Sequence, residues 1–230
     1  METRSRKPHF GPAGARVAEP TGRPQGRAST VGRVDDDAGP AGEQLLTARL
    51  SLRRPTPADI DVIHAIHSDE RACAHNPGDL LLSRADAAEL YHRWDEHWRR
   101  YGFGYRVIRP RRGRTVLGFC GTKSSRRRDR KVLNLFYRLD PTAWGDGVAT
   151  EAAGAVIDWA TGQLPEHPVV ARVRSANVAS QRVATRVGLR RVPHLDSPGE
   201  DGLDWIFVPP AWAAPAHWTA RRRRPVRPST

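Results

Sequence analysis

The sequence predicts a mixed α/β (α+β) fold in which one central, mostly antiparallel sheet carries helices on both faces. Three observations lead to this fold class. Several short segments alternate apolar and polar residues, as strands do, whereas four other segments place apolar residues at helical intervals. Their order along the chain is strand, two helices, three strands, helix, strand, helix and strand. This mixture of successive strands and intervening helices is typical of α+β domains.

The first part of the pattern contains one strand and two helices. Residues 46–53 alternate and are predicted to form the first strand, and residues 59–67 predict a short helix. The second helix begins at a capping box whose N-cap is Ser83, with Asp86 where Glu is usual. Its large apolar residues recur at helical spacing and are interpreted as core: Ala87, Tyr91, Trp94 and Trp98.

Three strands follow, at residues 103–109, 115–122 and 132–139. An arginine-rich Pro/Gly turn at residues 109–114 separates the first two and predicts an antiparallel hairpin. A second arginine-rich segment, residues 124–130, is predicted to be the loop before the third strand. Both clusters are interpreted as solvated loops, with attraction of phosphates, of an acidic protein or of an RNA-rich surface as the functional alternatives.

The last part alternates helices and strands. A helix is predicted at residues 147–162 and a strand at residues 169–175. A second helix, residues 179–187, is closed by Gly188, and a final strand covers residues 203–208.

Composition narrows the class of protein. The chain has 230 residues, of which 38% are apolar, below the usual share of about 45–50%. Its net charge is +13, and three of its 38 basic residues are lysines, so 35 are arginines. This surplus favours anionic ligands and disfavours polycationic ones, such as aminoglycosides, unless a local acidic cleft reverses it.

Cysteine content and hydropathy exclude further classes. The two cysteines, Cys73 and Cys120, exclude a disulfide scaffold and a four-cysteine zinc site, so no metal is expected. The sequence contains neither a run of roughly 18 apolar residues nor the apolar core of a secretory signal. We therefore expect a reduced, soluble, cytoplasmic protein without a membrane partner.

Two tails are expected to flank a single domain at residues 45–212. Residues 1–44 hold seven glycines and five prolines and few large apolar residues, so we expect a disordered N-terminal tail. Residues 213–230 include a run of four arginines and are expected to form a basic C-terminal tail. The alternative for both tails is a loose attraction to nucleic acid.

The most informative segment is residues 137–152, where a strand is followed by a Pro turn, a glycine-rich loop and a helix. The first backbone N–H groups of a helix lack intrahelical partners and carry partial positive charge. Gly145 and Gly147 allow a ligand to approach them closely, so the segment predicts a phosphate-binding loop. The alternative is a plain strand–helix turn. The loop has no Gly-Lys-Ser/Thr for a Walker motif, and Thr150 stands where a dinucleotide fingerprint needs glycine.

Two segments carry a resemblance to a known family. Residues 144–149, Trp-Gly-Asp-Gly-Val-Ala, resemble the acyl-coenzyme A loop of the GNAT acetyltransferases, although Trp144 departs from the usual Gln or Arg. Extended to Thr-Glu-Ala, the segment resembles the ribosomal-protein N-terminal alanine acetyltransferase branch. Residues 177–189 resemble the same branch's Asn-x-x-Ser segment, with Leu189 in place of Phe. The matches extend over residues 46–210.

The resemblance implies how acetyl-coenzyme A would bind as a co-substrate. Residues 135–139 and 169–175 would form two strands that splay apart, with the pantetheine arm between them and the pyrophosphate on the amides of residues 145–150. Asn177 would bond the pantetheine, or act as the N-cap of the following helix. The cofactor-binding residues implied are Tyr137, Arg138, Leu139, Trp144, Gly145, Asp146, Gly147, Val148, Ala149, Thr150, Asn177 and Ser180.

The implied reaction is the attack of an amine on a thioester. Many family members place a tyrosine acid seven residues after the Asn, where this chain has Ala184. Ser180 is therefore the candidate catalytic residue, as proton donor or thiol-positioning group, and its alternative is a first-turn hydroxyl that bonds the backbone.

The general base is left open. Asn134 occupies the position where the branch often has Glu, and an amide cannot take a proton. His64, His67, His75 and Glu151 are candidates among which the sequence does not choose.

The resulting hypothesis is an N-acetyltransferase that moves an acetyl group from acetyl-coenzyme A to a primary amine, on a protein N-terminus such as that of a ribosomal protein or on a small molecule. Nucleic acid is an allowed but not a required partner, and a monomer or homodimer is expected. The alternative is a basic ribosome- or nucleic-acid-associated protein with a catalytically degenerate fold of the same family.

Overall fold

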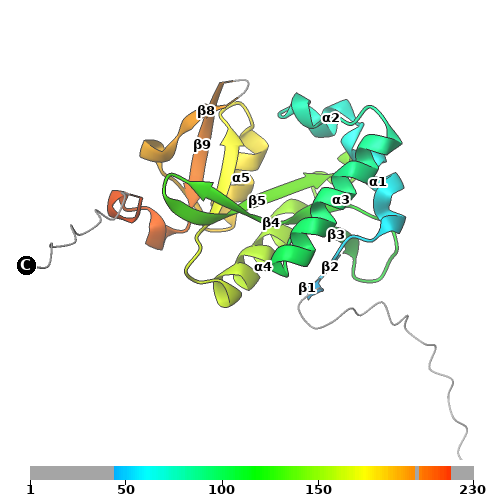
Figure 1. Ribbon diagram of the computed structural model, residues 1–230, viewed down its shortest axis with the longest axis horizontal. Coiled ribbons are helices and arrows are strands. Elements are labelled where there is room, and N and C mark those ends of the chain that lie inside the picture. The colour runs from blue at the N-terminus through cyan, green and yellow to red at the C-terminus, as the bar shows by residue number, and fades with distance from the viewer. Residues whose placement is uncertain (1–43, 200–201, 219–230) are drawn as a thin grey trace, which may run out of the picture. The chain divides into compact units, whose positions relative to one another are not determined.

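The computed structural model describes residues 44–199 and 202–218. Within them, a single sheet has the strand order β1-β2-β3-β4-β5-β6-β9-β7, with β8 paired to β9 (Figure 1). Every strand pair is antiparallel except β5–β6, so the predicted mixed, mostly antiparallel sheet is confirmed. The strands are β1 (Leu45–Leu46), β2 (Leu50–Arg53), β3 (Tyr105–Pro110), β4 (Gly118–Arg127), β5 (Arg130–Leu139), β6 (Val169–Arg174), β7 (Arg190–Arg191), β8 (Ser197–Gly199) and β9 (Gly202–Val208).

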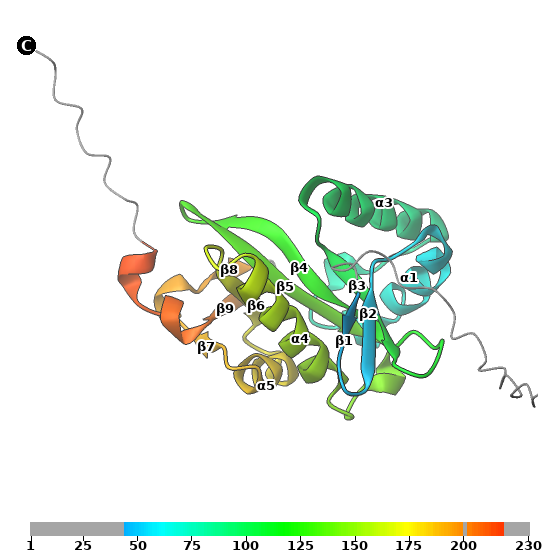
Figure 2. The ribbon, with the colours of Figure 1, turned by 90° about the horizontal axis from the view of Figure 1, so that it is seen from below.

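Helices cover both faces of the sheet, as predicted. Helices α1 and α3 lie on one face and α4 and α5 on the other, with the strands between them (Figure 2). The α-helices are α1 (Ile60–His67), α2 (Glu70–Cys73), α3 (Arg84–Tyr101), α4 (Val148–Gln163) and α5 (Val178–Arg186). Short 3-10 turns connect several elements, among them Pro77–Asp79 and Pro141–Ala143.

Helix α3 follows the sequence prediction closely. The capping box forms, because the Ser83 hydroxyl accepts a hydrogen bond from the Asp86 amide and the Asp86 carboxylate accepts one from the Ser83 amide. All four residues expected to face the core are buried. Ala87, Tyr91 and Trp94 pack with α1, Val107 and Phe119 into one apolar cluster, while a larger cluster lies between α4, α5 and the opposite face of the sheet.

The strand predicted at residues 46–53 is wrong in one respect, because the structure divides it into β1 and β2. These two strands pair with each other in antiparallel register. The Thr47 hydroxyl accepts from the Leu50 amide at 2.8 Å, and the Thr47 amide donates to the Leu50 carbonyl at 2.9 Å. These local bonds close a turn where alternation alone predicted a continuous strand.

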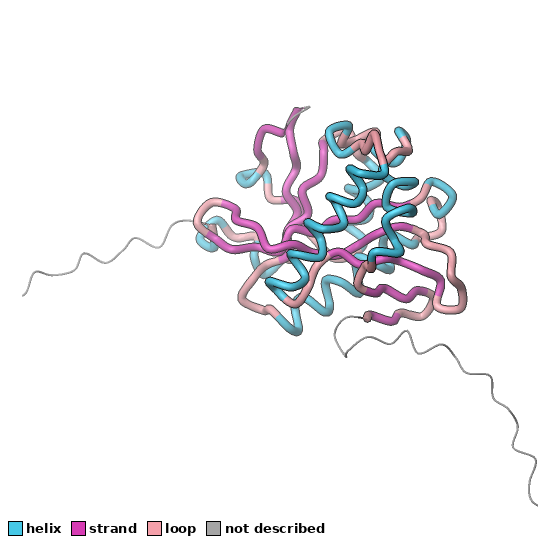
Figure 3. Tube along the Cα trace, turned by 45° about the vertical axis from the view of Figure 1, so that its right-hand side comes forward, coloured by secondary structure: helices cyan, strands magenta, loops and turns pink. Residues whose placement is uncertain are grey.

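The loop predicted at residues 124–130 is also wrong. Strands β4 and β5 stay paired from Gly118 and Leu139 out to Arg127 and Arg130, with the turn at residues 128–129. Their hairpin extends as a long ribbon (Figure 3). The arginines that predicted a solvated loop donate hydrogen bonds to backbone carbonyls of the C-terminal part of the described chain: Arg127 to Leu195, Arg128 to His194 and Arg130 to His217.

The described chain stays packed at its C-terminal end. Trp218, which lies within the expected basic tail, is only 3% exposed, and its indole N–H donates to the Trp212 carbonyl at 2.6 Å. It belongs to a third apolar cluster with Val170, Ile206 and Val208. The rest of that expected tail, and the expected N-terminal tail as far as residue 43, lie outside the described residues.

The β5–β6 pair opens toward its carboxyl end. The two parallel strands are paired only at Leu133–Val169, Asn134–Val170 and Leu135–Ala171, although β5 runs on to Leu139 and β6 to Arg174. This opening matches the splayed pair that the resemblance implies. The Leu133 amide donates toward β6, to the Pro168 carbonyl. Because backbone groups alternate sides along a strand, those of Tyr137 and Leu139 also face the opening.

Candidate functional site

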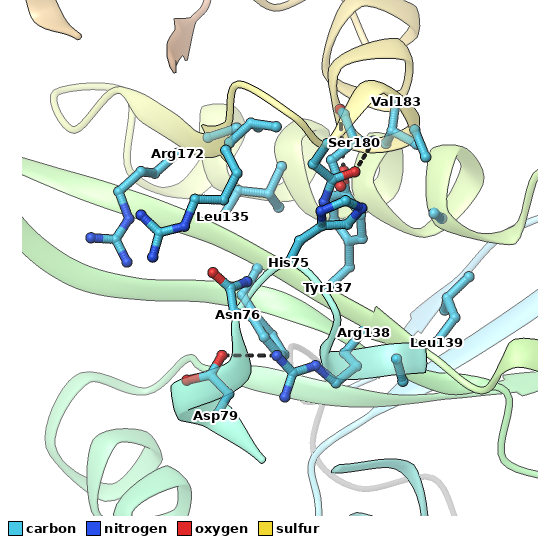
Figure 4. Close-up of a pocket in the computed structure, with 18 of the residues that line it drawn as sticks. His75, Asn76, Asp79, Leu135, Tyr137, Arg138, Leu139, Arg172, Ser180 and Val183 are labelled. Atoms are coloured by element: carbon cyan, nitrogen blue, oxygen red, sulfur yellow. Dashed lines mark hydrogen bonds and ion pairs between the residues drawn. The ribbon is translucent and has the colours of Figure 1, made fainter. Parts of the chain in front are cut away.

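A cavity of about 1120 Å³ lies at this opening. It is lined by residues of α1, α2, α3 and α5, of strands β3 to β6 and β9, and of the segment that enters α4 (Figure 4). Eleven of the twelve residues that the sequence implied for cofactor binding line it, and Asp146 is the exception. We call residues 144–150 with α5 the loop end of the cavity, and Lys123, Asn134, Phe136 and Arg138 with the covering residues of α1 to α3 its sheet face.

The loop end presents backbone rather than side chains. Gly145 and Gly147 have φ values of 91° and 75°, in the left-handed region that only glycine enters at little cost. Gly147 is the N-cap of α4 and supplies no side-chain cap. The amides of Val148, Ala149 and Thr150 therefore stand at the start of a 16-residue helix, where an anion would meet both N–H donors and the positive end of the helix dipole.

Glu151 fastens this loop to the N-terminal hairpin. Its carboxylate accepts from the Thr47 hydroxyl at 2.5 Å, from the Arg49 amide at 3.0 Å and from the Arg49 Nε at 2.6 Å. Burial alone would raise the pKa of Glu151, but these hydrogen bonds outweigh it and hold the pKa below its ordinary value. Glu151 does not line the cavity, so it is placed as an anchor rather than as the base.

Asn177 and Ser180 lie together at the first turn of α5. The Asn177 side chain accepts a hydrogen bond from the Ser180 amide at 2.9 Å, so Asn177 acts as the N-cap of α5 in this structure. The Ser180 hydroxyl makes no hydrogen bond to the backbone of the described residues; its partner is the Tyr137 phenol, and Ser180 lines the cavity. The alternative in which that hydroxyl bonds the backbone is therefore not what the structure contains.

Tyr137 brings a phenol to the same place. Its hydroxyl donates to the Ser180 carbonyl at 3.3 Å, and burial raises the pKa of Tyr137 to about 12 (Figure 4). Ala184, one turn further along α5, is buried in the cluster against which Tyr137 packs. The sequence singled out Tyr137 only for its place on the strand. Position 184, where many family members have a tyrosine, is alanine here, and nothing in the sequence indicated that the Tyr137 side chain would reach α5.

The histidine candidates separate clearly. His64 and Glu151 do not line the cavity, whereas His67 and His75 do. His67 is only 2% exposed, and its Nδ1–H donates to the Ile63 carbonyl at 3.0 Å, which leaves Nε2 as the unprotonated nitrogen. Burial and the positive charge of Arg138 lower the pKa of His67 to about 3. His67 is thus neutral at pH 7, with its one proton on Nδ1 and with Nε2 as a hydrogen-bond acceptor.

The sheet face combines Asn134 and Arg138, which the sequence singled out, with side chains that it did not, such as Lys123. Arg138 is 5% exposed, and one Nη donates to the Asp79 carboxylate at 2.8 Å (Figure 4). Lys123 stands opposite Asn134 in the β4–β5 register, and its Nζ lies 4.6 Å from the centre of the Tyr105 ring. Burial and the nearby Arg93 lower the pKa of Lys123 to about 8. These contacts join segments far apart in the chain, so no local motif indicated them.

Metal-binding groups and membrane-spanning helices would point to other classes of protein. Among the residues that the structure describes, no group of three or more His, Cys, Asp or Glu side chains is arranged to hold a metal ion. Over the same ranges, none of the helices combines the length and apolarity that crossing a membrane requires.

Comparison with known proteins places the chain in a family. Residues 49–190 match the family model described as an acetyltransferase (GNAT) domain. An uncharacterized N-acetyltransferase of Schizosaccharomyces pombe is 27% identical over 161 residues, which cover 63% of this chain and 82% of that protein. The chain spans about half the length of another curated relative, an uncharacterized protein of Bacillus subtilis, with 29% identity over 89 residues and 39% of this chain covered.

Solved structures agree with this placement. An acetyltransferase from Agrobacterium tumefaciens superposes with a TM-score of 0.61 at 26% identity, over 72% of this chain and 92% of that one. RimL, a ribosomal L7/L12 α-N-protein acetyltransferase solved in complex with coenzyme A, shares the fold with a TM-score of 0.60 at 16% identity, over 72% and 96%. With a family model that matches more than half of its length and a sheet that opens between β5 and β6, this chain belongs to the GNAT acetyltransferase family of acyltransferases.

Proposed function

We propose that this protein transfers an acetyl group from acetyl-coenzyme A to a primary amine, by direct attack of the amine on the thioester. The observation that carries the proposal is one cavity that joins the backbone edge of β5, the uncapped start of α4 and the hydroxyl of Ser180. RimL, which shares the fold, was solved with coenzyme A, and this supports acetyl-coenzyme A as the co-substrate.

Each part of the cavity has a role in this proposal. The amides of Val148, Ala149 and Thr150 bind the pyrophosphate, because a helix N-terminus without a side-chain cap offers unpaired donors to an anion. The backbone groups of Tyr137 and Leu139 pair with the amides of the pantetheine arm as a neighbouring strand would. The thioester then lies between the splayed strands, beside the first turn of α5.

The reaction itself asks for two proton movements. The amine nitrogen, after losing its ammonium proton to water, attacks the carbonyl carbon and forms the C–N bond. The C–S bond breaks, and the leaving sulfur is protonated. Ser180 is the proposed donor or positioning group for that sulfur, because Ser180 lines the cavity and its hydroxyl makes no hydrogen bond to the backbone of the described residues. A backbone N–H at the edge of β5 stabilises the negative charge that develops on the carbonyl oxygen.

The base in this proposal is water rather than a side chain. His67 lines the cavity with an unprotonated Nε2, but its pKa of about 3 makes it a hydrogen-bond acceptor that orients the amine or a water molecule and does not keep the proton. Asn134 orients in the same way, since an amide accepts a hydrogen bond but is not a base.

Calorimetry on the full chain tests the proposal first. Acetyl-coenzyme A, coenzyme A and ATP are titrated separately, and acetyl-coenzyme A is expected to bind in the micromolar range, well above ATP in affinity. A panel of amines, from peptide N-termini to spermidine, is then assayed for free thiol release. Absence of acetyl-coenzyme A binding at moderate salt contradicts the proposal.

A further inference from the structure

The sheet face of the cavity carries an unusual balance of charge. Its basic side chains are Arg71 of α2, Arg93 of α3, Lys123 of β4 and Arg138 of β5, and the adjoining strand β6 adds Arg172 and Arg174. Two acidic side chains line the cavity with them, Asp79 and Asp204. Arg182 and Arg186 belong to α5 at the loop end, and they are left out of this balance because the phosphates of the co-substrate account for them.

Both acidic side chains are already paired. Asp79 accepts from Arg138 at 2.8 Å. Asp204 is 1% exposed and accepts from Arg174 at 2.8 Å, with the Arg172 Nε 3.5 Å from its second oxygen. Each carboxylate therefore has an arginine beside it that balances its charge, although Oδ2 of Asp204 accepts no hydrogen bond and the Asp79 side chain is 54% exposed. The cavity has more basic than acidic side chains, so the local acidic cleft that would reverse the basic charge of the chain is not formed here.

Two of the cations have capacity left. Nη1 of Arg138 is buried and has no hydrogen-bond partner, in a side chain that is 4% exposed and lines the cavity. Lys123 makes no ion pair within the described ranges, and the contact that it does make is with the Tyr105 ring. A buried donor or charge left unpaired is costly, which indicates that a ligand completes both groups.

The strand register sets the distance between these two points. Lys123 is paired with Asn134, and Asn134, Phe136 and Arg138 follow one another at steps of two residues on one face of β5. At about 3.4 Å per residue, the backbone positions of Lys123 and Arg138 are separated by about 13–14 Å along the sheet. An amine that reacts midway, beside the splayed part of β5, is therefore about 7 Å along the strand from each of these backbone positions, or roughly two residues of extended peptide.

We propose that the acceptor is a peptide N-terminus with a carboxylate within about two residues of the reacting amine, which pairs with Nη1 of Arg138 or with Lys123. This inference rests on the proposed function and names the substrate class of the same site. It also disfavours polyamines as acceptors, because the cavity holds more cations than carboxylates and each carboxylate already has an arginine beside it.

Matched peptides test the proposal on the full-length protein. Three hexapeptides that begin with serine carry Glu, Gln or Lys at positions two and three and are otherwise identical. Thiol release is followed at pH 7 and low salt. We expect kcat/KM for the acidic peptide to exceed that for the neutral one by about tenfold or more, with the basic peptide lower again. Equal values for the three peptides, or a preference for the basic one, overturn the proposal.

A pair of lysine variants isolates the charge responsible. In Lys123→Gln the acidic-to-neutral ratio is expected to fall by about fivefold. Lys131→Gln removes the same charge from β5 at a side chain that does not line the cavity, and it keeps the ratio of the parent protein. A ratio that falls equally in both variants shows a general effect of net charge and overturns the assignment of Lys123.

The design separates this inference from the proposed function. If acetyl-coenzyme A binds and the neutral peptide is acetylated at the same rate as the acidic one, the proposed function stands and the inference fails. If no peptide is acetylated, binding of the three peptides to the coenzyme A complex is measured by calorimetry. Tighter binding of the acidic peptide then supports the inference, and equal binding overturns it.

Discussion

The two ends of the cavity are built by different means. The loop end consists of backbone amides, two left-handed glycines and the first turn of a helix, all within residues 144–150. The sheet face consists of charged side chains from α3, β4, β5 and β6 whose partners lie far away in the chain, such as Arg138 with Asp79. One end is therefore determined by local sequence and is the proposed site of the co-substrate, whereas the other is determined by tertiary contacts and is the proposed site of the acceptor.

The strongest test of the loop end is Gly147→Glu. A non-glycine residue at φ 75° is strained, and the added carboxylate would stand where the phosphates bind. We expect acetyl-coenzyme A binding to weaken by about 100-fold or more in calorimetry, which corresponds to about 2.8 kcal/mol.

The matched control for this change is Gly154→Ala in the middle of α4, where an added Cβ meets no atom within 4 Å. This variant is expected to bind acetyl-coenzyme A normally and to gain up to about 1 kcal/mol in unfolding free energy. If Gly147→Glu bound acetyl-coenzyme A normally, the loop end would not be the binding site of the co-substrate.

Ser180→Ala tests the chemistry where the two ends meet. The change removes the hydroxyl but keeps the amide that Asn177 caps, so binding should persist while protonation of the sulfur is slowed. We expect kcat to fall about 10- to 100-fold, with the affinity for acetyl-coenzyme A within about threefold of the parent. Ser175→Ala, at an exposed serine that does not line the cavity, is the control. An unchanged kcat in Ser180→Ala would leave Ser180 without a catalytic role.

A pH series sharpens the assignment of the sheet face. The groups that face Lys123 are Arg93 and His97 of α3, Tyr105 of β3 and Asn134 of β5. Since the pKa of Lys123 is lowered to about 8, it loses its charge as the pH rises through that value. The acidic-to-neutral peptide ratio should fall severalfold between pH 7 and pH 9.

Taking a ratio cancels the titration of the attacking amine, which is the same in both peptides. The decline should be absent in Lys123→Gln. A decline of the same size in that variant would assign the pH effect to another group.

The smallest expected effect concerns the anchor behind the loop end. Glu151→Gln keeps the shape of the side chain but weakens its bonds to Thr47 and Arg49, with an expected loss of about 0.5–1 kcal/mol in unfolding free energy at pH 7. Because the pKa of Glu151 is lowered in the folded state, this stabilisation is present above its ordinary value of 4.5 and is lost as the pH falls through the folded-state pKa.

The control is Asp61→Asn, which breaks a pair with Arg84 in which both side chains are largely exposed. Its cost in denaturant unfolding should be near zero at either pH. Equal costs for the two variants would show that Glu151 is an ordinary surface charge.

The same contrast explains how far the sequence predicts the molecule. Glycine spacing and helical periodicity predict the loop, α3 and the order of the elements, because each depends on residues close together in the chain. The division of residues 46–53 and the paired ribbon at residues 124–130 could not be predicted in this way. The hairpin is anchored by Glu151, a hundred residues away, and the ribbon by arginines that reach Leu195 and His217.

The candidate site divides in the same way. Asn177 and Ser180 were found from their local segment, whereas the reach of Tyr137 to α5 and the pairing of Arg138 with Asp79 depend on how strands and helices meet. Arg138 lies on the same strand as Phe136, and its burial indicates that a charged group is held inside the protein. The acidic partner of Arg138 cannot be predicted from the sequence of that strand.

The early end of pairing between β5 and β6 has a consequence for the dynamics of the sheet. Beyond Leu135 and Ala171 the interior strands lack a neighbour along part of their length, so the amides of Tyr137 and Leu139 should exchange with deuterium faster than those of Leu133 and Leu135. A bound ligand that supplies a strand edge should slow exchange at those two positions and leave β2 and β3 unaffected. The exchange rates of two amide protons in the middle of the sheet therefore report whether a ligand is bound, without any turnover.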